Sequence, residues 1–314
     1  AFGSAKKLVE EVASEIANEE SSDHCTFWFV EAEFVRQSHE LTLPVFSELR
    51  ESAVLVQHTL SQAEALRGAY QHEICAVSHV WESKGAPDTE GAQMRAIQCH
   101  LRDNPDIQLV WYDFWCMPQG ERTASDEFVF AWMLRNVNML FLGCSVLIVM
   151  DMSYLSRFWT QFEAWLSMQR GSSSGLIPAP PEADRSTIVC IHHATRGMED
   201  EKLIKMWRTA ACDDALFALA SPDVLVTNLA DKEMQLLKIQ TLDEDVRSAY
   251  GVAQATELRR QGHTVEDLLD TGFALQVVRD AGWRLTEIVA AYRASGTELR
   301  ELGVTVNELL ASGA

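Results

Sequence analysis

Four short runs of consecutive apolar residues divide the middle of the chain. A strand that is buried on both faces of a sheet needs such a run, whereas a strand with one solvent-facing side alternates apolar and polar residues. Helical segments at 90–103 and 126–140 separate some of these runs and suit crossover connections. The pattern predicts an open α/β fold, a parallel sheet flanked by helices, with strands at 74–78, 107–112, 145–150 and 187–191.

The segments on either side of these runs have other patterns. Residues 6–20 carry apolar side chains at helical spacing with glutamates between them, which predicts a packing helix with one buried stripe. Residues 27–35 are rich in aromatic and β-branched residues and predict a strand. The remaining expectations are a helix at 44–66, a loop or flexible insertion at 171–181 and mostly helical structure at 202–247.

The C-terminal part predicts an α-helical repeat tail. Glycines recur at close to ten-residue spacing, and the residues three and six positions after the first four of them are apolar. Thr264 with Asp267, and Thr305 with Glu308, have the spacing of a helix capping box. Each unit is therefore expected to be a short capped helix that ends at a left-handed glycine and buries its apolar face on its neighbours. The glycines are Gly262, Gly272, Gly282, Gly303 and Gly313.

These patterns divide the 314 residues into three parts. They are an N-terminal packing helix (1–26), an α/β domain (27–250) and ten-residue helical repeats (251–314). A repeat array offers a surface for a protein partner or for self-association.

Charge and cysteine usage narrow the environment and the partners. A formal net charge of −20 repels nucleic acid and anionic lipid headgroups, so neither is an expected partner. The seven cysteines are dispersed and never form a Cys-x-x-Cys pair, which favours reduced thiols and a cytoplasmic location. The longest apolar stretch, 139–150, is too short to span a bilayer.

Three mixed aromatic and polar clusters each follow an apolar run. Six of the nine tryptophans fall between residues 81 and 165, several of them interleaved with polar groups. In open α/β sheets, ligands bind beyond the carboxyl ends of the strands, so the clusters predict a ligand site on that edge. The polar residues gathered there would be Ser78, His79, Asp113, Asp151, His192 and His193.

The same clusters resemble the signature blocks of the heterokaryon-incompatibility (HET) family, which is related to the Toll/interleukin-1 receptor (TIR) superfamily. The blocks are Ser78-x-x-Trp81, Trp111-x-Asp113-x-x-Cys116-x-x-Gln119 and Arg157-x-Trp159-Thr160-x-x-Glu163. A TIR-like order is visible as well: a strand that ends in Ser, a strand that ends in Asp, and a Ser-Tyr-Leu-Ser segment that leads into a Trp-x-x-x-Glu helix. The resemblance covers residues 74–195. It implies a flavodoxin-like sheet, self-association, a signalling or defence role and, in the catalytic branch, cleavage of NAD by a glutamate at the position of Glu163.

A single glutamate suits that chemistry. Cleavage of the nicotinamide–ribose bond passes through an oxocarbenium-like ribose, which a buried carboxylate can stabilise or attack. Nicotinamide is already cationic in NAD, so its departure needs no second acid. Phe158, Trp159, Phe162 and Trp165 surround Glu163 in sequence and would desolvate an inward-facing carboxylate. The alternative is that Glu163 lies on an exposed helix face or pairs with Arg157.

The other candidate residues have two interpretations each. Ser78, His79, Trp81 and Asp113 would line the pocket, and Arg157 or Trp159 would position the substrate. Tryptophan is more often a core residue, although the neighbours of Trp81 are polar. Asp113 fits a ribose hydroxyl or Mg²⁺, and fits equally well a cap for the following turn.

No metal site and no bound cofactor are expected; NAD would be a substrate. Adjacent strand residues point to opposite faces, so His192 and His193 are poorly placed to share an ion with Asp151. Cys116 with His79 would suit a thiol nucleophile, but no third group that would orient the histidine is evident, so Cys116 is expected to be buried and inert. Two hypotheses remain, an NAD-cleaving enzyme and a non-catalytic scaffold that assembles partners through the α/β domain and the repeats.

Overall fold

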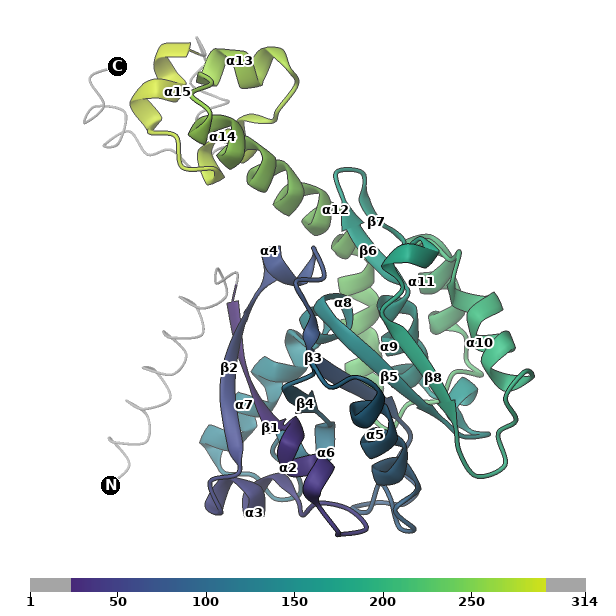
Figure 1. Cartoon of the computed structure of the whole chain (residues 1–314). Coiled ribbons are helices and arrows are strands. Elements are labelled where there is room, and N and C mark those ends of the chain that lie inside the picture. Colours follow the sequence, from purple (N-terminus) through teal and green to yellow (C-terminus); the bar gives the residue numbers. More distant parts are fainter. Residues whose placement is uncertain (1–23, 292–314) are drawn as a thin grey trace. The chain divides into compact units, whose positions relative to one another are not determined.

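A six-stranded sheet forms the centre of the α/β part (Figure 1). The computed structural model describes residues 24–291, so the predicted N-terminal helix and the repeat units after residue 291 lie outside the described residues. The strands lie side by side in the order β2 (Leu55–Ser61), β1 (His24–Glu31), β4 (Leu109–Trp111), β3 (Tyr70–His79), β5 (Cys144–Met150) and β8 (Ser186–Cys190).

Four neighbouring strands, β4, β3, β5 and β8, are parallel, and they coincide with the four apolar runs. This part of the prediction is confirmed. The chain leaves β3 toward β4 on one side and later returns to β5 on the other side, so the winding direction reverses between β3 and β5. In open α/β sheets the crevice at such a reversal, beyond the carboxyl ends of the strands, is where ligands bind.

Helices cover both faces of the sheet. Figure 1 shows α2 and α5 in front of it and α7, α8 and α9 behind it. The helices are α2 (Ala32–Gln37), α3 (Phe46–Glu51), α4 (Gln62–Ala65), α5 (Ala92–Asp103), α6 (Asp113–Cys116), α7 (Ala124–Arg135), α8 (Asn138–Gly143), α9 (Phe158–Ser167), α10 (Glu199–Trp207), α11 (Cys212–Ala220) and α12 (Leu229–Arg260). Two 3₁₀ turns, η1 (Tyr154–Ser156) and η2 (Pro181–Ala183), complete this part.

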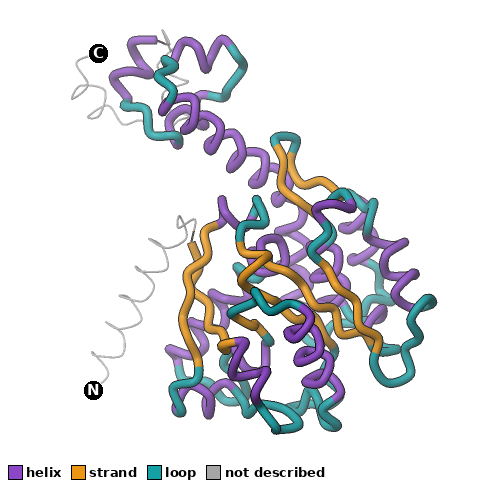
Figure 2. Tube along the Cα trace, viewed as in Figure 1, coloured by secondary structure: helices purple, strands orange, loops and turns teal. Residues whose placement is uncertain are grey.

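Two predictions were wrong. The segment 44–66 is not one helix: α3 ends before Ala53, which has a positive φ of 56°, and residues 55–61 form β2, antiparallel to β1. The segment 171–181 is not a simple loop, because β6 (Gln169–Ser172) and β7 (Gly175–Pro178) form a two-stranded hairpin (Figure 2). Gly175 enters β7 with a φ of 103°, a conformation that glycine adopts readily.

The chain divides into two compact units. Of the described residues, 24–170 and 178–236 form one unit, and 171–177 and 237–291 form the other, with the boundary inside α12. In the second unit, α13 (Val265–Asp270), α14 (Leu275–Asp280) and α15 (Leu285–Ala291) are the expected short helices.

Within the described units the structure confirms the left-handed glycines and the shared apolar core, whereas a side-chain N-cap is present on α13 and not on α14. Gly262, Gly272 and Gly282 all have a φ near 90°, and Thr264 and Asp267 cap α13 reciprocally. The apolar faces share one core that includes Val265, Leu268, Val278, Trp283 and Ile288. The glycines at 303 and 313 and the pair Thr305 and Glu308 lie outside the described residues. Between residues 24 and 291 no helix has the length and apolarity needed to cross a membrane.

Candidate active site

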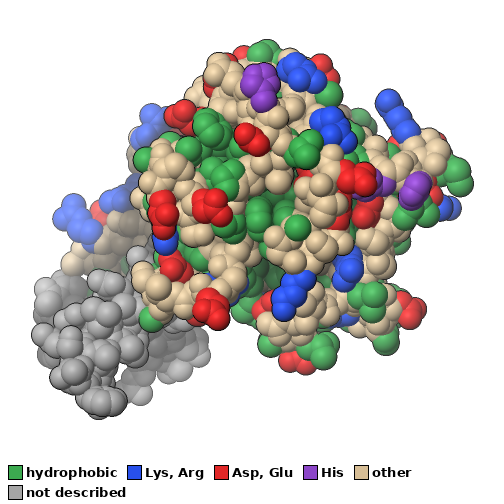
Figure 3. Space-filling view, turned by 90° about the horizontal axis from the view of Figure 1, so that it is seen from below, with side chains coloured by type: hydrophobic (Ala, Val, Ile, Leu, Met, Phe, Trp, Pro, Cys, Tyr) green, Lys and Arg blue, Asp and Glu red, His purple; other side chains and the backbone are tan. Residues whose placement is uncertain are grey.

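A cavity of about 670 Å³ opens beyond the carboxyl ends of the parallel strands. These strands run downward in Figure 1, and Figure 3 looks at the molecule from below, where a hollow contains hydrophobic side chains and has acidic side chains near it. The cavity walls come from the end of β3 and the loop after it, the start of α6, α7, α9 and the segment before α12. The cavity therefore belongs to the α/β unit and lies at the edge that the sequence predicted.

Glu163 reaches this cavity from the second turn of α9. Its Oε2 accepts a hydrogen bond of 2.6 Å from Oγ of Ser78, the next-to-last residue of β3. Ser78 Oγ is also 2.5 Å from the hydroxyl oxygen of Tyr154 in η1. Both Ser78 and Tyr154 are completely buried, so the carboxyl group is held from the protein side and meets the cavity on the other.

Burial raises the pKa of Glu163 well above its ordinary value. The hydrogen bond from Ser78 acts in the opposite direction because it favours the charged form, and the nearby charge of Asp113 raises the pKa further. The carboxyl therefore keeps its proton to a higher pH than an exposed glutamate does. Carboxyl groups with this behaviour, placed in a cavity, are typical of catalytic sites.

Asp113 is another carboxylate of the cavity, and one hydrogen bond, from Trp81, orients it. Nε1 of Trp81 donates a hydrogen bond of 2.8 Å to its Oδ2, and Nε2 of His79 lies 3.2 Å from its Oδ1. The imidazole of His79 stacks on the ring of Tyr112 at a centroid distance of 4.0 Å. The side-chain amide of Gln119 donates to the backbone carbonyl of Asp113 at 3.0 Å and so links the segment after α6 to the first residue of that helix. The carboxylate of Asp113 thus has a fixed orientation.

Aromatic side chains and three cations complete the walls. The rings that line the cavity belong to Trp81, Trp111, Phe130, Phe158 and Trp159. The cations are Lys84, Arg122 and Arg157, and the guanidinium of Arg122 lies 3.5 Å from the centroid of the Phe130 ring. Four carboxyl groups, those of Glu82, Asp113, Glu163 and Asp231, also line the cavity. A planar ligand that carries charges of both signs matches this set of walls.

The structure brings together most of the residues predicted from sequence. Glu163, His79, Trp81, Asp113, Arg157 and Trp159 all line the cavity. Glu163 is not on an exposed face, and its recorded hydrogen-bond partner is Ser78 and not Arg157. Ser78 departs from expectation, because it is completely buried and contacts Glu163 where the sequence analysis expected it to face the ligand.

Three contributors were not predicted from the sequence. Tyr154 belongs to the Ser-Tyr-Leu-Ser block that was recognised only as a motif, and its hydroxyl completes the contacts behind Glu163. Phe130 lies in α7, within the segment expected only as a crossover helix, and Arg122 lies in the loop before α7, for which no role was predicted. No motif in 122–130 pointed to the cavity.

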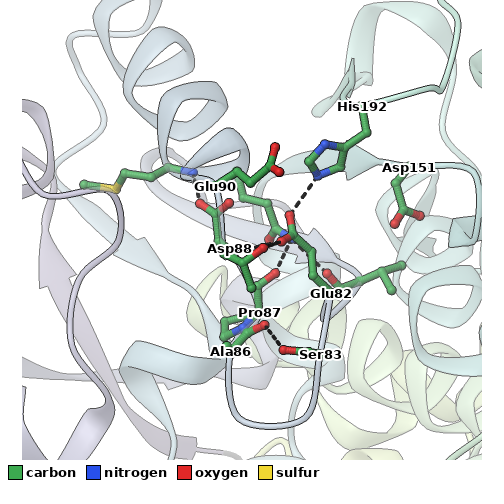
Figure 4. Close-up of polar contacts among 12 residues, drawn as sticks. Glu82, Ser83, Ala86, Pro87, Asp88, Glu90, Asp151 and His192 are labelled. Carbon is green, nitrogen blue, oxygen red and sulfur yellow. Dashed lines mark hydrogen bonds and ion pairs between the residues drawn. The ribbon is translucent and has the colours of Figure 1, made fainter.

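Asp151, His192 and His193, which were expected at this edge, do not line the cavity, although His192 contacts Glu82, which does. His192 has a φ of 52°, and its Nε2 is 2.7 Å from Oε1 of Glu82 (Figure 4). Burial raises the pKa of Glu82, but hydrogen bonds from Thr89 and His192 outweigh it and leave the pKa below the ordinary value. No group of His, Cys, Asp and Glu among residues 24–291 has an arrangement that could hold a metal ion. Cys116 is buried, and burial raises its pKa to about 12, so the thiol stays protonated.

Comparisons of the chain with protein-family models, with curated proteins and with solved structures found no match.

Proposed function

We propose that this protein cleaves NAD at the nicotinamide–ribose bond, with Glu163 as the catalytic carboxylate. The observation that carries the proposal is the placement of Glu163: a desolvated carboxyl group, anchored by Ser78, that faces a cavity with aromatic walls. The resemblance of the three sequence blocks to HET and TIR proteins supports the same assignment and, with it, a role in signalling or defence.

The raised pKa of Glu163 fits a cationic substrate. A nicotinamide cation next to the carboxyl favours the ionised form, so binding lowers the pKa of Glu163, which releases its proton to solvent and becomes a carboxylate. When the C–N bond breaks, its electron pair leaves with nicotinamide, which becomes neutral, and positive charge develops on the ribose. The Glu163 carboxylate stabilises that charge or bonds to the anomeric carbon, and water then supplies the hydroxyl group of the product and releases a proton.

The other cavity residues have matching roles. The carboxylate of Asp113, oriented by the hydrogen bond from Trp81, has Oδ1 free of a hydrogen bond and is able to accept one from a ribose hydroxyl. The rings of Trp81 and Trp159 offer flat faces for the nicotinamide or the adenine. Arg157, with the other cations of the cavity, counters the charge of the phosphates.

The test is chromatographic detection of nicotinamide after the purified chain is incubated with NAD. We expect release by the wild type and none by Glu163→Gln, which removes the charge but keeps the shape and still accepts the Ser78 hydrogen bond. Glu64→Gln is the matched control, because Glu64 is an exposed carboxyl that also accepts a hydroxyl hydrogen bond. Absence of release by the wild type, free or assembled, would favour the scaffold hypothesis, and full activity of Glu163→Gln would exclude Glu163 as the catalytic group.

A further inference from the structure

Three side chains from three different elements form a buried hydrogen-bonded chain behind the candidate catalytic carboxyl. Tyr154 lies in η1, Ser78 at the end of β3 and Glu163 in α9. The two distances are 2.5 Å between the Tyr154 and Ser78 hydroxyl oxygens and 2.6 Å from Ser78 Oγ to Glu163 Oε2.

The number of protons available fixes which group donates in each of these hydrogen bonds. Each hydroxyl group has one proton to donate. When Glu163 is ionised, Ser78 donates its proton to the carboxylate oxygen, so the short contact with Tyr154 then requires the tyrosine to donate to Ser78. Tyr154 is completely buried, so water does not reach this series of hydrogen bonds from the tyrosine side.

A second contact fixes Tyr154 relative to the helix that carries Glu163. Oγ1 of Thr160, on α9 and three residues before Glu163, donates a hydrogen bond of 2.6 Å to the backbone carbonyl of Tyr154. The backbone and the hydroxyl group of Tyr154 are thus both tied to α9, the second through Ser78. The strand end, the turn after β5 and the helix are locked at the point where the sheet reverses its winding.

We infer that Ser78 and Tyr154 are positioning residues, which hold Oε2 of Glu163 on the protein side and leave Oε1 for the substrate. The inference rests on the proposed function of Glu163. Oε1 has no hydrogen bond to any residue in the described part of the chain, in contrast to Oε2. The carboxyl group is therefore presented to the cavity in one orientation, without rotation to be lost when the transition state forms.

The hydrogen bonds from Tyr154 and Ser78 also affect the pKa of Glu163. A hydrogen bond donated to a carboxylate stabilises its charged form, and the Ser78 bond accordingly opposes the effect of burial on the pKa. Loss of the Ser78 hydroxyl should raise the pKa of Glu163 further. Loss of the Tyr154 hydroxyl should act in the same direction but less strongly, because it acts through Ser78.

The test compares Ser78→Ala and Tyr154→Phe with two controls that remove equivalent hydroxyls elsewhere. Ser167→Ala removes a completely buried hydroxyl that bonds to the carbonyl of Ala164 on the same helix as Glu163. Tyr70→Phe removes a tyrosine hydroxyl that bonds to a carboxyl at the opposite end of β3. Thermal melting establishes that each variant is folded at the temperature of the assays.

The first measurement is the titration of the Glu163 carboxyl by infrared absorbance, identified as the signal that is lost in Glu163→Gln. We expect a higher midpoint in Ser78→Ala than in the wild type, a smaller increase in Tyr154→Phe and no change in the controls. The second measurement is nicotinamide release, where kcat should fall by roughly 10- to 100-fold in Ser78→Ala with a much smaller change in KM, because positioning acts on the transition state.

The two measurements separate the two ideas. A wild type that releases no nicotinamide contradicts the proposed function, while the titration still decides whether Ser78 and Tyr154 act on Glu163. Midpoints in Ser78→Ala and Tyr154→Phe that equal those of the wild type and the controls would overturn the inference.

Discussion

The two ends of β3 each join a tyrosine hydroxyl to a carboxyl group, yet they differ in what surrounds the carboxyl. At the start of the strand, the hydroxyl of Tyr70 donates to Oε2 of Glu64 at 2.6 Å and accepts from the backbone amide of Ser61 at 2.8 Å. Glu64 is exposed to solvent. At the end of the strand, Tyr154 and Ser78 lead to Glu163, whose carboxyl lies at the inner wall of a cavity.

This difference shows that burial, and not the choice of chemical groups, makes one end a candidate for catalysis. At the start of β3 burial acts mainly on the phenol, where desolvation and the hydrogen bond to Glu64 raise the pKa of Tyr70 to about 12. At the other end, desolvation raises the pKa of the carboxyl itself. At the start of β3, Tyr70 therefore stays neutral, as an exposed tyrosine would. At the end of β3, Glu163 stays protonated, and a cationic ligand can ionise it.

The largest expected effect on stability comes from a substitution at Gly143, beside the start of β3. A Cβ atom on Gly143 would lie 2.8 Å from Cα of Ala65 and 3.2 Å from the Tyr70 ring. Since backbone would have to shift, we expect Gly143→Ala to lower the free energy of unfolding by about 1–3 kcal/mol. Denaturant titration measures this loss, and nicotinamide release per folded molecule should equal that of the wild type. A variant with normal stability would show that this end of β3 is less tightly packed than the structure indicates.

The second prediction concerns the pH dependence of stability. A carboxyl whose pKa is higher in the folded state than in the unfolded state contributes stability below its unfolded pKa, and this contribution is lost as the pH rises to the folded pKa. Glu163→Gln should therefore gain stability relative to the wild type across that window, by about 1.4 kcal/mol for each unit of pKa difference. Denaturation at a series of pH values measures the gap between the two proteins. A gap that does not change with pH would mean that Glu163 is as well solvated as an exposed glutamate.

The smallest expected effect concerns Asp113. Trp81→Phe keeps an aromatic ring but removes the indole N–H that donates to Asp113. We expect NAD binding to weaken by roughly tenfold, about 1.4 kcal/mol, because the Asp113 carboxylate loses the hydrogen bond that orients it. The melting temperature should change little, since Trp81 is only partly buried. Calorimetric titration with NAD in the Glu163→Gln background, where cleavage is blocked, measures the affinity; unchanged affinity would remove Asp113 and Trp81 from the ligand site.

The parallel part of the sheet was predictable from sequence because consecutive apolar residues have few alternatives in a folded chain. The strand β2 was not predictable, because apolar and polar residues alternate only weakly from Leu55 to Leu60. The helix before it also made the whole segment look helical. The hairpin at 169–178 was hidden by its glycines and serines, which predict turns as readily as strands.

The candidate site was predictable to a similar extent. Residues at the carboxyl ends of parallel strands must share an edge, and this brought His79, Asp113 and Glu163 together in the prediction. The role of Ser78 depends on which way a single side chain points at the end of β3. The role of Tyr154 depends on a 3₁₀ turn that orients its hydroxyl. Neither property follows from the spacing of residues along the chain.

The central claim is that binding of NAD ionises Glu163 and that the resulting carboxylate acts in catalysis. The pH dependence of nicotinamide release by the wild type tests this claim most directly. The profile of kcat/KM reports the free protein and that of kcat reports the complex with NAD. We expect both to rise with pH, with the midpoint of kcat at a lower pH than that of kcat/KM, because the nicotinamide cation lowers the pKa of Glu163. Two profiles that are flat across the range in which the protein is folded, or a kcat midpoint above that of kcat/KM, would contradict this account.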